Sequence, residues 1–180
     1  MRLHIHDTLA IGVDYQERLI PAIQDKETLI RNSRLLFSGL EILGVPVVVS
    51  RQYPKGLGDT VPEIREVTVK ATVLDKLSFS CYQDSAIKQT VDAAGRRTVV
   101  LSGTEAHVCV LQTAIDLREA GFRVVLVADC AGSRRSGDKE YGLRRAAGEG
   151  AILVSYEQLL FELLAGASSP GFKALSALLK

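Results

Sequence analysis

Residues 97–129 read RTVVLSGTEAHVCVLQTAIDLREAGFRVVLVAD, and this stretch decides the fold class. Two continuous apolar runs, at 97–101 and 122–129, enclose a helix-like segment over 106–120 that ends before Gly121. Parallel strands that are covered on both faces are continuously apolar, and consecutive parallel strands need a crossover, which is usually a helix. The stretch therefore predicts a strand–helix–strand unit, the building block of α/β proteins.

Similar segments alternate along the rest of the chain. Further strands are expected at 9–14, 45–50, 71–76 and 151–155, and further helices at 26–43, 82–94, 138–148 and 156–164. The segment 51–64, rich in Pro and Gly, is expected to be a loop, and 165–180 is a C-terminal tail without a predicted structure. The alternation predicts a single α/β domain over 1–180, with a mostly parallel, Rossmann-like sheet and helices on both faces.

The composition argues against several classes of function. The formal net charge is +1, so no global electrostatic attraction draws the protein to nucleic acid or to an anionic membrane. No apolar stretch approaches the roughly 18 residues that a membrane span needs, and the N-terminal sequence does not resemble a secretory signal. We therefore expect a small-molecule substrate and a cytoplasmic location, with neither nucleic acid nor membrane as a partner.

The cysteines and glycines argue against a metal or nucleotide cofactor. Cys81, Cys109 and Cys130 are an odd, sparse set without metal-ligand spacing, so they are expected to be free thiols in a reducing compartment. The sequence has no Walker loop, and its segment GTEAHV has one glycine where a dinucleotide-binding turn needs several. No cofactor is expected.

Chemically useful residues follow the predicted strands, where the sites of open parallel sheets lie. Asp14 and Lys76 each end a strand, and Cys109 lies about one turn into the helix that follows 97–101. A helix start favours a thiolate, a carboxylate can take the thiol proton, and an ammonium group stabilises both anions. Each residue also has a structural reading: a helix cap for Asp14, a solvated lysine with Asp75 as its rival, and a small core residue for Cys109.

Other polar residues fit a site less well. His107 is two residues from Cys109, so the two side chains diverge on a helix, and a Cys–His pair would need His4 or His6 from the N-terminal segment. Cys81 and Cys130 are interpreted as structural. The basic group that includes Arg134 and Arg135 is interpreted as a solvated or subunit-contact face.

The chain resembles the isochorismatase-like cysteine hydrolase superfamily over roughly 7–164. The resemblance lies in Asp14-Tyr15-Gln16, in Lys76 and in SGTEAHVCVLQTAIDLREAGF (102–122), while 51–64 resembles the branch of isochorismatase domain-containing proteins. It implies a three-layer α/β/α fold, a homo-oligomer, and a catalytic triad of Asp14, Lys76 and Cys109. The implied reaction is cofactor-independent hydrolysis of a small amide-like C–N bond through a thioester on the cysteine.

The resemblance also implies details of the site. A cis peptide is expected at Thr104–Glu105, which would aim the N–H groups of Glu105 and Cys109 at the oxyanion. The histidines that hold a metal in the nicotinamidase branch are missing after the second strand, so a zinc-type site is not expected. Gln16, Ser50 and Gln52 are expected to line the pocket instead.

Two alternatives remain open from the sequence. The chain could be a non-catalytic, oligomeric binding or scaffold member of the family that keeps the pocket. It could also hydrolyse a vinyl ether, a reaction that family members carry out without the cysteine. The first alternative predicts uniformly slow alkylation of the three cysteines, and the second predicts that Cys109→Ala stays active.

Overall fold

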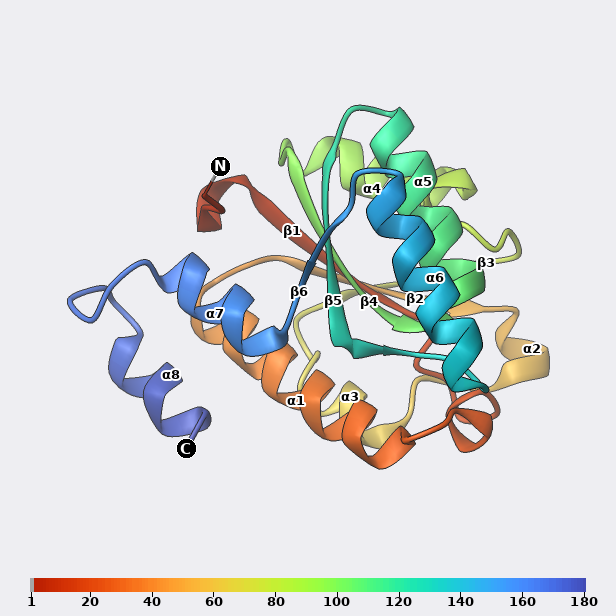
Figure 1. Ribbon diagram of the computed structural model, residues 1–180, viewed down its shortest axis with the longest axis horizontal. Helices are drawn as coiled ribbons and strands as arrows, with labels where there is room; N and C mark the ends of the chain where they lie inside the picture. The colour runs from red at the N-terminus through yellow and green to blue at the C-terminus, as the bar shows by residue number, and fades with distance from the viewer. Residues whose placement is uncertain (1) are drawn as a thin grey trace.

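The computed structural model describes residues 2–180, which form a six-stranded parallel sheet with helices on both faces (Figure 1). The strand order is β3-β2-β1-β4-β5-β6, and every neighbouring pair is parallel. The strands are β1 (Thr8–Val13), β2 (Val47–Gln52), β3 (Thr72–Lys76), β4 (Thr98–Thr104), β5 (Arg123–Gly132) and β6 (Ile152–Val154). The predicted α/β class with a parallel sheet is confirmed.

The helices form two layers, as expected for a three-layer α/β/α sandwich. In Figure 1, α1 and α7 cover one face of the sheet, and α4, α5 and α6 cover the other. The helices are α1 (Lys26–Ile42), α2 (Pro54–Leu57), α3 (Pro62–Arg65), α4 (Ser85–Ala93), α5 (Leu111–Glu119), α6 (Ser136–Gly148), α7 (Tyr156–Leu164) and α8 (Phe172–Leu178). Short 3₁₀ turns occur at Ile5–Asp7, Ile20–Ala22 and Cys81–Gln83, and a π-helical turn, Ala106–Val110, precedes α5.

The two faces of the sheet bury separate hydrophobic clusters. Along β4, Val100 packs into the cluster of α1 and α7, whereas Val99 and Leu101 pack into the cluster of α4 and α5. Successive side chains of a strand point to opposite faces, so a strand covered on both sides must be apolar at every position. This packing explains the continuous apolar runs that predicted the strands.

Three expectations about local structure were incomplete. The segment 51–64 is not a plain loop, because α2 and α3 lie within it and each begins with a proline at its first position, where the missing N–H costs nothing. The tail contains α8. The strand predicted at 97–101 continues to Thr104, because small and polar residues there still pair with β1 and β5.

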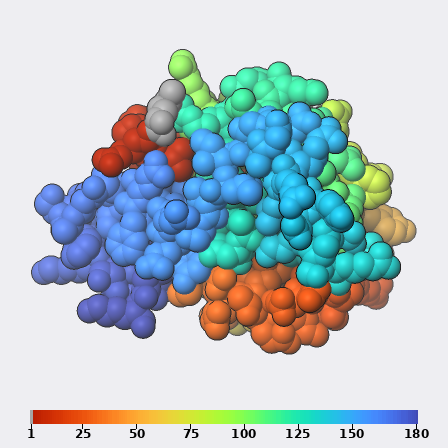
Figure 2. Space-filling view, viewed as in Figure 1, coloured from red at the N-terminus to blue at the C-terminus, as the bar shows by residue number. Residues whose placement is uncertain are grey.

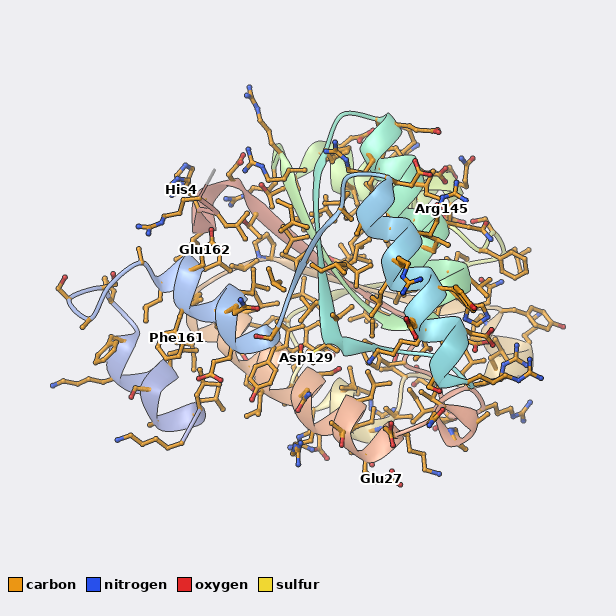
Figure 3. The ribbon with its side chains drawn as sticks, in the orientation of Figure 1. His4, Glu27, Asp129, Arg145, Phe161 and Glu162 are labelled. Atoms are coloured by element: carbon orange, nitrogen blue, oxygen red, sulfur yellow. The ribbon has the colours of Figure 1, made fainter. Side chains whose placement is uncertain are left out.

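The N-terminal segment lies beside the C-terminal part of the chain (Figure 2). The Leu3 N–H donates a hydrogen bond to Glu162 Oε1 over 2.9 Å, and Figure 3 labels Glu162 next to His4. This contact ties the start of the chain to α7, at the amino end of β1.

The strand order places a crevice at the carboxyl end of β1. From the β1–β4 pair, the chain builds outward through β2 and β3 on one side and through β5 and β6 on the other. Open α/β sheets bind their ligands where the strand order reverses in this way. Asp14 follows β1 and the segment from Glu105 to Cys109 follows β4, so both lie at this point.

Candidate active site

Asp14 is held in a fixed orientation in the interior. Its side chain is fully buried, and its φ of 51° lies in the left-handed region, which aspartate tolerates better than most residues. Ser50 Oγ donates to Asp14 Oδ1 over 2.7 Å, and Lys76 Nζ donates to Oδ2 over 2.7 Å. The next helical turn begins only at Ile20, so Asp14 is a side chain of the buried site and not a helix cap.

Lys76 is a buried ammonium group with all its protons engaged. Its Nζ has four acceptors within 3.2 Å: Asp14 Oδ2, Gln52 Oε1 and the carbonyls of Ser78 and Phe79. An ammonium group has three protons, so none is left over. Burial alone lowers the pKa of Lys76, but Asp14 and the nearby thiols outweigh it and the pKa is raised. Lys76 therefore stays charged.

Asp75, the rival of Lys76, lies outside this group. Its side chain is half exposed and its carboxylate pairs with Arg51 Nε over 2.7 Å. The residues of β3 alternate between the sheet faces, so Asp75 and Lys76 point in opposite directions. The solvated reading applies to Asp75 and not to Lys76.

Cys109 belongs to the π-helical turn that precedes α5, and the residue is 8% exposed. It lies within electrostatic reach of Asp14, Lys76 and Cys81. Burial is the main cause that raises the pKa of its thiol to about 12; Asp14 adds to the rise, and Lys76 offsets only part of it. The expectation that the helix start eases ionisation was wrong, because burial beside a carboxylate outweighs the helix dipole.

Cys81 is the residue that sequence reasoning missed. Its Sγ donates to Ser50 Oγ over 3.4 Å, and Ser50 donates to Asp14, so a chain of hydrogen bonds links the thiol to the carboxylate. Burial, followed by the charge of Asp14, raises the pKa of Cys81 to about 11. Thr113 Oγ1 accepts from the Cys81 N–H and donates to the Cys109 carbonyl. No spacing in the sequence signals this placement, because Cys81 precedes α4 and Cys109 precedes α5.

The two glutamines form a support behind Lys76. Gln52 Oε1 accepts from Lys76 Nζ over 2.8 Å, and the Gln52 N–H donates to Gln16 Oε1 over 2.7 Å. Gln16 is fully buried, and its Nε2 donates to the carbonyls of Gln52 and Gly58. Gln16 is therefore bonded to backbone, whereas Gln52 touches the ammonium group directly.

A cavity of about 660 Å³ opens beside Lys76. Two exposed apolar residues line it: Leu77 is 75% exposed and Tyr53 is 51% exposed. Phe79, which is close in sequence, is 55% exposed. The lining residues are Tyr53, Pro54, Lys55, Asp75, Lys76, Leu77, Ser78, Gln83, Asp84 and Ser85. Of the expected triad, only Lys76 lines this cavity.

The peptide bond between Thr104 and Glu105 is cis, as the resemblance implied. Thr104 Oγ1 donates to the Asp14 carbonyl over 2.7 Å, which ties the end of β4 to the end of β1. Gly103 precedes it with φ 123°, and a side chain there would meet the Val13 carbonyl at 2.0 Å. The close approach of the two strand ends therefore requires a glycine.

None of the histidines pairs with Cys109 within residues 2–180. His107 Nδ1 lies 3.0 Å from Ser133 Oγ. The rings of His4 and His6 stack on each other before the start of β1, and His4 is labelled in Figure 3. Asp14, in contrast, follows the end of β1. The geometry therefore excludes a Cys–His pair.

The arginines of the basic group are paired with acids. Arg134 Nε lies 3.0 Å from Glu105 Oε1, and Arg135, Arg144 and Arg145 face Asp138, Glu140 and Glu149, respectively. Over residues 2–180, no three His, Cys, Asp or Glu side chains are grouped so that they could hold a metal ion. In the same part of the chain, no helix has the length and apolar character to cross a membrane.

Comparison with known proteins identifies relatives. The chain is 41% identical to isochorismatase domain-containing protein 1 from Salmo salar over 96% of its own length and 61% of that protein. It is 36% identical to the secreted isochorismatase effector Isc1 from Phytophthora sojae, over 99% of this chain and 87% of that protein. The chain thus spans about three fifths of the salmon relative.

Solved structures share the fold. The MAR1 ribonuclease from Caenorhabditis elegans superposes with a TM-score of 0.93 at 35% identity, covering 99% of this chain and 92% of that one. The YcaC gene product from Escherichia coli, described as an octameric hydrolase of unknown specificity, superposes with a TM-score of 0.92 at 22% identity over 99% and 90%. At that identity, the second likeness concerns the fold alone.

The family model for the isochorismatase domain matches residues 8–158, which include the whole sheet and every residue of the candidate site. The chain therefore belongs to the isochorismatase-like hydrolase family.

Proposed function

We propose that the protein is a cofactor-independent cysteine hydrolase that cleaves a small amide-like C–N bond through a thioester on Cys109. The observation that carries the proposal is the fully buried Lys76–Asp14 ion pair beside the Cys109 thiol. Burying two charges is costly unless they are paired and hydrogen-bonded. A sequence that maintains this pair next to a thiol at the strand-order reversal is expected to use it.

The proposed reaction begins with proton transfer from Cys109 Sγ to Asp14 as the sulfur attacks the substrate carbonyl carbon. The N–H groups of Glu105 and Cys109 then hold the oxyanion. The C–N bond breaks, and Asp14 returns the proton to the leaving nitrogen, which leaves a thioester. A water molecule then attacks the thioester through its oxygen while Asp14 takes a proton from that water. The Cys109 thiolate is released and regains the proton from Asp14.

The raised thiol pKa shapes this mechanism. A thiol with a pKa of about 12 is protonated at neutral pH, so Cys109 is a neutral thiol before the substrate binds. Deprotonation must accompany attack, which requires a base in contact with the thiol. Lys76 pairs with the Asp14 carboxylate over 2.7 Å. Because all its protons are used in hydrogen bonds, Lys76 is an electrostatic organiser and not a proton donor.

The site favours a small substrate. Cys109 is 8% exposed and Asp14 is fully buried, so only a small acyl group can reach the sulfur. The cavity beside Lys76 offers about 660 Å³ for the rest of the molecule. Its mixed lining of Tyr53, Leu77 and Ser78 suits a compact group with both apolar and polar parts.

A homo-oligomer is part of the proposal. Leu77, Phe79 and Tyr53 expose apolar surface around the cavity mouth, and exposed apolar patches of this kind mark interaction sites. The octameric state described for the YcaC gene product supports assembly. The cytoplasm is proposed as the compartment because all three cysteines are free, although the Phytophthora sojae relative is named a secreted effector.

The test is a screen of small primary amides and carbamoyl compounds against the wild type and Cys109→Ala, with the intact protein mass recorded after rapid acid quench. We expect turnover and a mass increase equal to the acyl group in the wild type, and neither in Cys109→Ala. A Cys109→Ala variant that still hydrolyses the substrate would overturn the thioester mechanism and favour the vinyl-ether alternative. Failure of the wild type on all amides, with uniformly slow alkylation of the three cysteines, would favour the non-catalytic alternative.

A ribonuclease is the second candidate, favoured by the 35% identity to the nematode protein of that name. Phosphate recognition needs unpaired cationic groups, but Arg134, Arg135, Arg144 and Arg145 all face carboxylates. Incubation with a labelled single-stranded RNA decides the matter. Cleavage that persists through purification and disappears in Cys109→Ala would establish RNA as a substrate in place of a small amide.

A further inference from the structure

A second cavity, of about 170 Å³, lies away from the candidate active site. It is enclosed by the start of α1, the carboxyl end of β5 and the first turns of α6, three segments that meet at one end of the molecule (Figure 1). Its lining includes the charged residues Asp25, Asp129 and Lys139 and the polar residues Gln24, Asn32 and Ser133. None of these residues belongs to the Asp14, Lys76 and Cys109 group.

One part of the lining offers oxygen acceptors. Asn32 is 7% exposed, and its Nδ2 donates to the Asp129 carbonyl over 3.1 Å, while its Oδ1 receives no hydrogen bond from residues 2–180. Asp129 Oδ1 accepts the Tyr156 N–H over 2.9 Å, which places its carboxylate beside the start of α7 (Figure 3). Asp25 precedes α1 without capping it. Within the described chain, neither carboxylate forms an ion pair.

The ammonium group of Lys139 lines the other side of the cavity. Lys139 is half-buried, and its Nζ makes neither an ion pair nor a hydrogen bond within the residues that the structure describes. Burial is the main cause that lowers its pKa; Asp129, Cys130 and Asp25 act in the opposite direction but lie too far away to form a contact. The cavity therefore separates one cation from two carboxylates, and none of these three charged groups forms an ion pair within residues 2–180.

We propose that this cavity binds a small zwitterion that carries an ammonium and a carboxylate group, such as a free amino acid. The ammonium group would bind Asp129, Asn32 Oδ1 and Asp25, and the carboxylate would bind Lys139. A ligand with only one of these charges would leave a half-buried charge of the protein without a partner. A cavity of about 150 Å³ accommodates benzene, so 170 Å³ leaves room for a side chain as large as that of leucine.

The cavity adjoins the segment that carries the candidate active site. At the end of the β4–β5 pair, Thr104 lies opposite Gly132, which lines the cavity. Ser133, also in the lining, is hydrogen-bonded to His107, two residues before Cys109. A bound zwitterion would therefore act on the segment from Thr104 to Cys109, and only this consequence rests on the proposed function.

Calorimetric titration of the full chain tests the proposal with three probes that share the same branched alkyl group. L-Leucine carries both charges, 4-methylpentanoate lacks the ammonium group, and 3-methylbutylamine lacks the carboxylate. We expect leucine to bind at least tenfold more tightly than either analogue, and equally well to Cys109→Ala, so that binding is judged separately from catalysis. Lys139→Gln and Asp129→Asn should each weaken leucine binding at least tenfold, while the control Arg144→Gln on the outer side of α6 should not.

Each other outcome overturns the proposal. Equal binding of 3-methylbutylamine indicates a cation site, equal binding of 4-methylpentanoate indicates an anion site, and no binding of leucine at millimolar concentration indicates an unoccupied cavity. Leucine affinity that is unchanged in Lys139→Gln places the ligand elsewhere. Asp129→Asn keeps an oxygen for the Tyr156 N–H, and Lys139→Gln removes no hydrogen bond or ion pair within residues 2–180, so both variants are expected to fold.

Discussion

Two strand ends of this molecule carry the same three kinds of residue with opposite results. After β1, Asp14 has Lys76 at 2.7 Å and the thiol of Cys109 close by, all in the interior. Near the end of β5, Asp129 has Lys139 and Cys130 close by, but within residues 2–180 the lysine forms neither an ion pair nor a hydrogen bond, and a cavity lies between the charges. The first group is complete by itself, and the second lacks a partner.

The contrast shows that the degree of burial determines whether charged residues must be paired within the protein. Charged groups that are removed from water need an oppositely charged partner to offset the loss of solvation. Asp14 and Lys76 form such a pair because β1 and β3 lie on either side of β2. Asp129 and Lys139 keep part of their water, since they lie at the rim, between α1 and α6. A closed charge group suits proton transfer, whereas an open one suits ligand binding.

The largest expected effect concerns the two thiols. Cys109→Ala should lower kcat at least about 10³-fold, because no other thiol can form the thioester. Cys130→Ala should leave kcat within about threefold, since Cys130 lies on the other side of the sheet in the cluster of α1. Steady-state kinetics on the amide found by the screen provides the measurement, and equal losses in the two variants would contradict the distinction between the two regions.

The two lysines should differ in stability. Lys76→Met leaves the Asp14 carboxylate buried without its cation, so the free energy of unfolding should fall by about 3–5 kcal/mol. Lys139→Met breaks no ion pair and should change it by less than about 1 kcal/mol. Urea denaturation of both variants makes the comparison. A further change, Asp14→Asn in the Lys76→Met background, should restore part of the loss, and no restoration would refute the ion-pair explanation.

Ser50→Ala sharpens the role of the hydrogen-bond chain. The variant removes the donor to Asp14 Oδ1 and the acceptor of Cys81 Sγ. Loss of a buried bond to a charged group should cost about 1–3 kcal/mol of stability. It should also lower kcat/KM, because the bond fixes the orientation of the Asp14 carboxylate. Ser50→Thr keeps the hydroxyl and serves as the control; an unchanged kcat/KM in Ser50→Ala would exclude a positioning role.

The smallest effect appears only at alkaline pH. The native state holds the protons of Cys81 and Cys109 up to about pH 11 and 12, whereas an unperturbed thiol loses its proton near pH 9. Because the folded pKa values are the higher ones, stability should be constant below pH 9 and fall above it, by less than about 1.4 kcal/mol per pH unit for each thiol. Urea midpoints from pH 7 to pH 10 test this, with Cys81→Ala as the comparison.

Much of the fold could be predicted because apolar runs report burial directly. The strand at 122–129 and the helix at 156–164 were both found from pattern alone, and the helix occupies Tyr156–Leu164. The helices within 51–64 were missed because they are four residues long, too short for a periodic signal. The π-helical start of the segment that carries Cys109 has no local signature either.

The amino-acid pattern alone specifies the alternation of strands and helices and the kinds of residue at each strand end. Which of those residues come into contact, and how burial shifts the pKa of the thiols, depends on the packing of the whole chain. Asp14 and Lys76 are 62 positions apart in the chain, and the pKa of Cys109 depends on burial that several elements create together. Local patterns reflect the environment of a strand or helix, whereas contacts between charges depend on how all the elements pack.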